Sequence, residues 1–121
     1  MSLPKGSLLK DRLVACAVSI VRFVDTISGS AFQAIIADHM IRLSTSAALN
    51  HGEAMAYLSR KDLTYRLKIC LREIRETRNS LMIVKKSDRY DRSIDVDLLL
   101  EEADQICAML FASTRTIEQK R

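Results

Sequence analysis

The sequence contains little glycine, proline or aromatic residue. Among 121 residues there are 3 Gly, 1 Pro and no Trp, and aromatic residues make up 5%. All-β sandwiches and barrels need turn residues at short, regular intervals, so this scarcity argues against them. The core must therefore consist of aliphatic side chains and methionine. Hydrophobic residues at 48% and charged residues at 28% are ordinary for one globular domain and exclude a disordered chain.

Long apolar runs are also absent. The longest, residues 13–21, is followed by Arg22 and is far shorter than the roughly 20 residues that a membrane-spanning helix needs. The N-terminal residues lack the order of basic, apolar and small residues that marks a signal peptide. Cys16, Cys70 and Cys107 are odd in number and lie within apolar segments, which favours buried, reduced thiols. Together these features predict a cytoplasmic protein without a membrane partner.

Apolar residues recur with the period of an amphipathic helix in four segments. We expect helices near residues 8–27, 31–58, 60–86 and 94–112. Ser7 can cap the first helix, while Gly29 suits a left-handed helix end and Ser30 the next N-cap. Residues 87–93 form a short polar loop, and the tail after Phe111 is expected to fray. The predicted fold is all-α: a single domain forming an up-down-up-down four-helix bundle.

The end of the second predicted helix and the start of the third carry two local signals. Residues 44–56 are unusually small, which lets two helix backbones approach closely. Ser59 and Asp62 form a capping-box variant in which Asp62 takes the place usually held by Glu or Gln. Since no loop residues separate the two predicted helices, we expect a tight hairpin.

No catalytic, cofactor-binding or metal-binding set of residues is recognisable. His39 and His51 lie three turns apart on one predicted helix, too far for a shared metal ion. The separation of Arg42 and His51 is too long for a helical ribonuclease motif, and Asp38–His39 reverses the order found in helical metal phosphohydrolases. Glu53 could serve as an acid or base, although a structural pairing, at a subunit contact for example, is favoured. We therefore predict that the protein is not an enzyme and needs no cofactor.

Charge is distributed unevenly along the chain. Residues 60–92 contain 11 Lys or Arg and 5 acids, a net charge of +6. Residues 93–121 are net −3, and residues 1–59 are net +1. The overall charge of +4 therefore conceals a basic third helix beside an acidic fourth helix.

Five cations of the third predicted helix form a stripe about 60° wide, nearly opposite its apolar line. We call this stripe the basic ridge: Lys61, Lys68, Arg72, Arg75 and Lys86. It extends about 37 Å at about 1.5 Å per residue, and Arg72–Glu76 is its one i,i+4 acidic pairing. Uncompensated cations predict a nucleic-acid phosphate partner, with Tyr65 as the obvious stacking residue. The alternatives are a solvated face or pairing with acids of the fourth helix, in the same subunit or a neighbour.

Apolar residues outside the main core faces predict self-association. The first helix is apolar over more than one face, and the third carries Tyr65, Ile69, Met82 and Ile83 away from its main apolar line. One small bundle has a single core, so these residues need another surface to cover them. The pattern predicts more than one copy without fixing the number.

Residues 42–62 carry a polar motif that consists of Arg42, Ser46, Asn50, Glu53, Ser59 and Asp62. Downstream lie Leu67, Lys68, Ile69, Arg72, Glu73, Glu76 and Thr77. Both segments resemble a known bacterial family, the four-helix-bundle proteins encoded in intervening sequences of 23S ribosomal RNA, whose downstream region has the pattern Lys/Arg-Glu-x-x-Glu-Thr. The superfamily also includes the accessory variability protein of diversity-generating retroelements. The resemblance implies a homopentamer and, for the accessory branch, binding of nucleic acid and of a reverse transcriptase.

Several positions depart from the family pattern. Leu43 replaces Ser, Ala47 replaces Ile, Leu49 replaces Ala and Leu63 replaces Phe, and the usual Leu-Pro before the second helix is missing. These differences indicate a divergent branch, nearer the accessory proteins. The leading hypothesis is thus a non-enzymatic, oligomeric, nucleic-acid-binding bundle. The rival hypothesis is a structural interaction module that docks an acidic protein and binds no nucleic acid.

Overall fold

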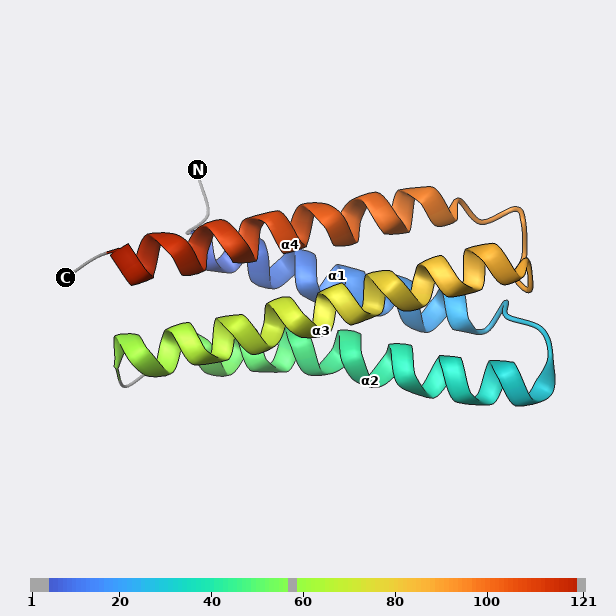
Figure 1. The fold of residues 1–121 in the computed structure, drawn as a ribbon, viewed down its shortest axis with the longest axis horizontal. Helices are drawn as coiled ribbons and strands as arrows, with labels where there is room; N and C mark the ends of the chain where they lie inside the picture. The colour runs from blue at the N-terminus through green and yellow to red at the C-terminus, as the bar shows by residue number, and fades with distance from the viewer. Residues whose placement is uncertain (1–4, 57–58, 120–121) are drawn as a thin grey trace.

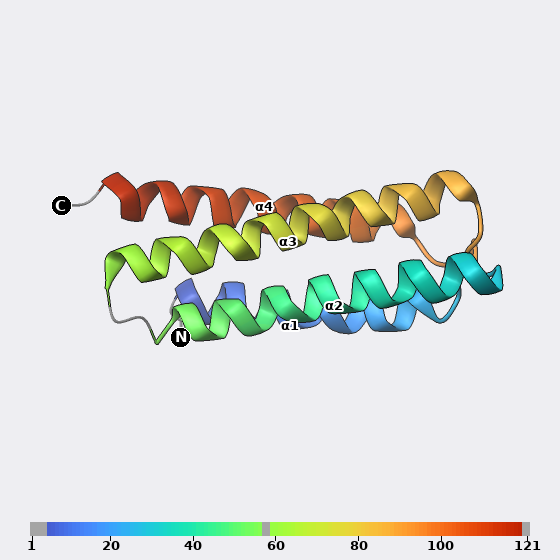
Figure 2. The same cartoon turned by 60° about the horizontal axis from the view of Figure 1, so that its bottom comes forward.

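The computed structural model describes residues 5–56 and 59–119, with side chains from residue 8 onward. The described residues form four α-helices and no strand. These are α1 (Lys5–Val24), α2 (Ser30–Ala54), α3 (Arg60–Ser87) and α4 (Val96–Gln119). Successive helices run in opposite directions (Figures 1 and 2), so the predicted all-α up-down-up-down bundle is confirmed. None of the described helices combines the length and apolarity that crossing a bilayer requires.

The first three helices begin or end at residues that differ from the sequence-based bounds. Helix α1 starts before Ser7, so Ser7 is not its N-cap, and it ends at Val24. Gly29, with φ of 93°, is the N-cap of α2 in place of Ser30. Helix α2 ends at Ala54, so the connection to α3 is longer than the predicted direct junction. The remainder of the predicted second helix, residues 57 and 58, lies outside the described residues.

The fourth helix is longer than predicted. Asp95 caps its start by accepting a hydrogen bond from the Leu98 backbone N–H at 3.1 Å. At the other end α4 continues to Gln119, and the expected fraying after Phe111 is wrong for residues 112–119. Thr114 is buried and donates to the Leu110 carbonyl at 2.8 Å, while Ile117 packs against the core. Tertiary packing therefore holds a segment whose own amphipathicity is weak.

The core is mainly aliphatic, as the composition predicts, although it includes the buried ring of Phe23. Leu13, Ile20, Met40, Ile74 and Ile106 are fully buried and come from all four helices. The loop between α3 and α4 covers one end of this core, because Tyr90 packs on the Phe23 ring with centroids 5.7 Å apart. The Ser28 backbone N–H also donates to the Arg89 carbonyl at 2.8 Å.

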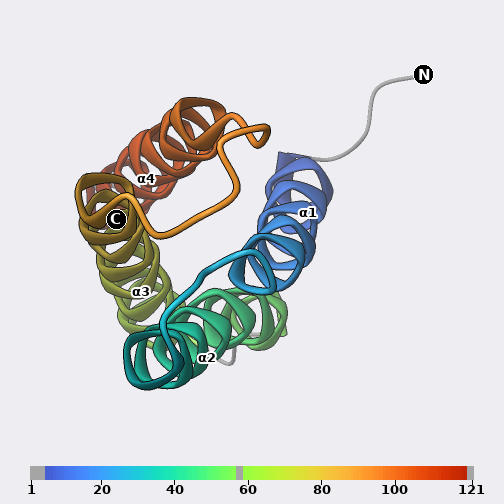
Figure 3. The same ribbon diagram turned by 90° about the vertical axis from the view of Figure 1, so that its right-hand side faces the viewer.

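The helices do not pack equally around the bundle. Neighbours in sequence pack closely, whereas the α1–α4 contact is the least extensive of the helix–helix contacts, and these two helices stand apart when the bundle is viewed from its end (Figure 3). Arg12 bridges this side, with bonds of 2.9 and 2.8 Å to the two carboxylate oxygens of Glu102. On the side that carries the basic ridge, α3 and α4 are by contrast closely packed against each other.

Small residues allow α2 and α3 to approach closely. Ser44, Ala47 and Ala54 are completely buried, and the Cys70 thiol of α3 donates to the Ala47 carbonyl at 3.3 Å. The predicted close approach of helix backbones thus occurs between these two helices.

Candidate nucleic-acid interface

All five residues of the basic ridge are exposed on α3. Among the described residues, Lys61, Arg72, Arg75 and Lys86 take part in no ion pair, whereas Lys68 contacts Glu118 of α4 at 3.0 Å. That pair is itself solvent-exposed, with 57% of the Lys68 side chain accessible, so it is weak and can exchange for another anion. The ridge thus presents four free cations and one loosely held cation.

Acidic residues of α4 pair mainly with cations outside the ridge. Arg78 contacts Asp104 at 2.9 Å, and Lys85 contacts Asp97 at 2.7 Å. Hydrogen bonding to Asp97 raises the pKa of Lys85 above its usual value. Pairing with the fourth helix, one of the alternatives for the ridge, is therefore realised at Lys68 but not at the other four ridge positions in the described structure.

Two open hollows lie along the groove between α3 and α4. The first, of about 270 Å³, is lined by Lys68, Arg72 and Arg75 of the ridge together with Phe111 and Arg115 of α4. The second, of about 580 Å³, is lined chiefly by the start of α3. Its lining residues are Arg60, Lys61, Thr64, Tyr65, Lys68 and Glu118. Since Lys68 and Glu118 line both hollows, their ion pair lies between the two hollows.

Sequence reasoning missed the contribution of α4 to this face. Phe111 is 49% exposed, and the Arg115 guanidinium carbon lies 5.8 Å from the centre of its ring, within cation–π range. Arg115 belongs to the tail that was expected to fray, whereas Phe111 lies at the end of the predicted fourth helix. The sequence feature that could have identified these residues is their spacing of four positions, which places Phe111 and Arg115 on one helix face if the helix continues. The interface therefore contains an aromatic ring and a cation that the ridge alone does not supply.

The family-like motif serves mainly to join and cap helices. The Asn50 amide donates to Ser46 of α2 and to Glu73 of α3, each at 3.1 Å. The Ser59 hydroxyl accepts from the Asp62 backbone N–H at 3.1 Å, so Ser59 is the N-cap of α3 as predicted. The bond to Glu73 fixes α3 relative to α2, and the bond to Ser59 starts α3, the helix that carries the ridge.

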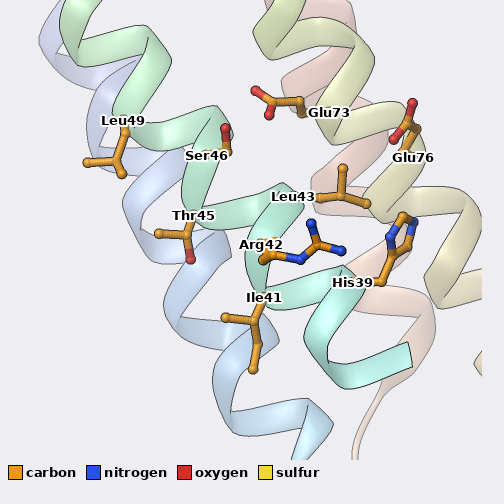
Figure 4. A pocket seen from close by; sticks show the side chains of 9 residues that line it. All are labelled: His39, Ile41, Arg42, Leu43, Thr45, Ser46, Leu49, Glu73 and Glu76. Carbon is orange, nitrogen blue, oxygen red and sulfur yellow. The ribbon is translucent and has the colours of Figure 1, made fainter. Parts of the chain in front are cut away.

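The remaining motif residues are exposed. Arg42 pairs with Asp38 at 3.0 Å within α2, and Glu53 lies on the surface. Figure 4 shows the groove of about 660 Å³ beside Arg42, in which Glu73 and Glu76 of α3 face side chains of α2. No constellation of catalytic type accompanies Glu53 in the described contacts.

Neither the histidines nor the cysteines are among the described residues that line the two hollows of the α3–α4 groove. His39 lies in the α2–α3 groove, whereas His51 is 1% exposed, and the described residues include no group of three potential ligands suited to a metal ion. Burial raises the pKa of Cys16 to about 11 and that of Cys70 to about 12. Cys107 is half-buried, and burial raises its pKa as well. Such thiols are poor nucleophiles at neutral pH.

Comparison with solved structures supports the fold. No protein-family model matches the sequence, and no curated protein matches it. A crystal structure from Bacteroides thetaiotaomicron, of a protein with unknown function from the S23 ribosomal protein family, is similar over 93% of this chain and 99% of its own. The TM-score is 0.82 and the sequence identity 23%. At this identity the likeness establishes a shared four-helix fold, and the chain has the architecture of that S23-family protein.

Proposed function

We propose that the protein is a non-enzymatic, homo-oligomeric bundle that binds the backbone of RNA or DNA through the basic ridge. The observation that carries this proposal is the exposure of four ridge cations that form no ion pair with described residues. A line of cations on one helix repels itself, and phosphates relieve that repulsion while releasing counterions. All five cations lie on α3, which packs closely against α4, so they form a row.

Oligomerisation is supported by a second surface, which we call the apolar patch. It consists of Val14, Val18 and Val21 of α1 and Leu49 of α2, which are 46%, 45%, 43% and 67% exposed. The three valines and Leu49 line a hollow of about 400 Å³ whose other residues include Ala17 and Ala48. A contiguous apolar surface on a small domain marks a contact site. Self-association through it would repeat the ridge and raise avidity without a new kind of contact.

The resemblance of the 42–62 motif to the intervening-sequence and retroelement accessory proteins supports the same proposal. It favours a ring of five and, for the accessory branch, a reverse transcriptase as an additional partner. The S23-family fold of the neighbouring structure is compatible with either branch.

The proposal is tested by replacing Lys68, Arg72 and Arg75 together with Gln. Binding of a fluorescent single-stranded RNA and of a DNA duplex is measured by anisotropy at about 100 mM salt. We expect both affinities to fall by at least tenfold, because each lost cation removes a phosphate contact. Circular dichroism and sedimentation should show unchanged helix content and oligomer size.

A matched control removes three exposed cations from the other helices. Replacing Lys10, Arg22 and Arg42 with Gln lowers the net charge by the same amount. Because Arg22 lines the hollow of the apolar patch, sedimentation must first show the parent's oligomer size, and the affinity should then be close to that of the parent. If the ridge variant binds as tightly as the parent, or if both triple variants lose affinity equally, the ridge is not the binding surface. If the parent binds no nucleic acid but captures an acidic protein, the docking-module hypothesis replaces this one.

A further inference from the structure

The groove between α3 and α4 pairs each cluster of cations with one exposed aromatic ring. In the first hollow Phe111 lies among Arg72, Arg75 and Arg115, and in the second Tyr65 lies beside Lys61 and Lys68. The Tyr65 side chain is 65% exposed and that of Phe111 is 49% exposed. Backbone phosphate binding alone requires no ring, so the aromatic residues need a separate explanation.

From this arrangement we infer that the groove selects single-stranded nucleic acid, with one base stacked on Phe111 and another on Tyr65 while the surrounding cations hold the phosphates. The inference rests on the proposed function and specifies the class of nucleic acid bound at the same site. Every base has a π-face that can stack on an exposed aromatic ring, so such binding tolerates any sequence. Bases inside a duplex are already stacked and paired, so they cannot reach these rings.

The positions of the rings fit two separate bases. Tyr65 precedes Arg72 by seven residues, about 10 Å along α3 at about 1.5 Å per residue, and Arg72 lines the hollow that holds Phe111. This offset exceeds the roughly 3.4 Å between stacked bases of one strand. The two rings therefore engage bases that are not immediate neighbours in the strand, and the strand follows the groove past Lys68.

The charges around both rings favour binding of the nucleic-acid backbone. Arg115 stands over the Phe111 ring at 5.8 Å, and a guanidinium in this position can contact a phosphate while it flanks a stacked base. Among the described residues, Glu118 is the one carboxylate that lines these hollows, and it is paired with Lys68. A strand in the groove thus meets one neutralised acid and at least four further cations.

The test compares a DNA strand of 16 nucleotides with an abasic strand of the same length, which keeps the phosphates and lacks the bases. Both are fluorescent, and anisotropy is measured with the full-length protein at about 100 mM salt. We expect the parent to bind the normal strand at least tenfold more tightly than the abasic strand, in line with the energy of base–aromatic stacking. The corresponding duplex should also bind more weakly than the single strand.

The variant Phe111→Leu/Tyr65→Leu keeps apolar side chains but removes both rings. We expect it to bind the normal and abasic strands equally, at the parent's affinity for the abasic strand. The control Leu98→Ala changes another exposed apolar residue of α4, outside both hollows, and should retain the preference.

Equal binding of the two strands by the parent would overturn the inference and leave the proposed phosphate binding intact, whereas no binding of any strand would refute the proposed function itself. Loss of self-association in the ring variant would identify the rings as a subunit contact and overturn the inference too.

Discussion

At the scale of single residues, His51 has the least ordinary environment. Its side chain is 1% exposed, and its Nδ1 atom has no hydrogen-bond partner among the described residues. Burial, with a smaller contribution from the positive charge of Lys10, lowers the pKa of His51 below its usual value. The folded protein therefore holds this imidazole neutral at a pH where the unfolded chain would bind a proton.

We predict that stability falls with decreasing pH because of His51. Below about pH 6.5 the unfolded state binds one more proton than the folded state, so the free energy of unfolding declines by up to about 1.4 kcal/mol per pH unit until the folded form also protonates. The variant His51→Leu lacks this contribution. Between pH 7.5 and 5.5, urea unfolding at fixed protein concentration should show a larger decline in the free energy of unfolding for the parent than for the variant. Equal declines in both proteins would contradict the predicted burial.

At the scale of the helices, periodicity located the elements but not all of their ends. The apolar spacing of α3 predicted its bounds within one residue, because the N-cap residue Ser59 marks where the helix begins. The end of α4 could not be predicted in this way, since residues 113–119 are held by packing against the bundle, through the buried Thr114 and through Ile117 at the core. Local sequence carries caps and periodicity, whereas packing against a distant helix becomes visible only in the fold.

The cap at the start of α3 yields a second prediction. The variant Ser59→Ala loses the side-chain acceptor for the Asp62 backbone N–H and should lower the free energy of unfolding by about 1 kcal/mol. Ser59→Asp keeps an acceptor and should remain close to the parent. Denaturant unfolding of the three proteins measures the difference. If Ser59→Ala unfolds at the same denaturant concentration as the parent, the cap adds no stability.

At the scale of the whole molecule, the sequence predicted that apolar residues would remain uncovered. The structure locates Val14, Val18 and Val21 on one side of α1, with Leu49 of α2 beside them. Their membership in a single patch could not be predicted, because it depends on how α1 and α2 pack together. The apolar residues of α3 outside its main apolar line differ in exposure. Tyr65 is exposed within the α3–α4 groove, whereas Ile69 and Met82 are half-buried.

We predict that the apolar patch mediates self-association. The parent should sediment as a multiple of 13.7 kDa at micromolar concentration. The variant Val18→Glu/Leu49→Glu places charges on residues that are already exposed, so it should fold normally, with the same helical signal, and sediment as the monomer. A parent that sediments at 13.7 kDa would show that the patch does not join copies of the chain.

The candidate site could also be predicted only in part, because it depends on how two helices pack together. The ridge follows from helical geometry on one segment, so the sequence suffices to align Lys61, Lys68 and Arg72. Phe111 and Arg115 join it only because α4 packs against α3 with that end beside Lys68. A site composed from two helices requires their relative register, which the sequence pattern does not contain.

The central claim, that the ridge binds nucleic-acid phosphates, is tested most directly by the salt dependence of affinity. For single strands the slope of log affinity against log salt is about −0.7 per phosphate contact. Between about 50 and 200 mM salt, the parent should show a slope steeper by about 2 than the variant in which Lys68, Arg72 and Arg75 are Gln. The control lacking the charges of Lys10, Arg22 and Arg42 should keep the parent's slope. Identical slopes for all three proteins, or no binding by the parent at the lowest salt concentration, would contradict the claim.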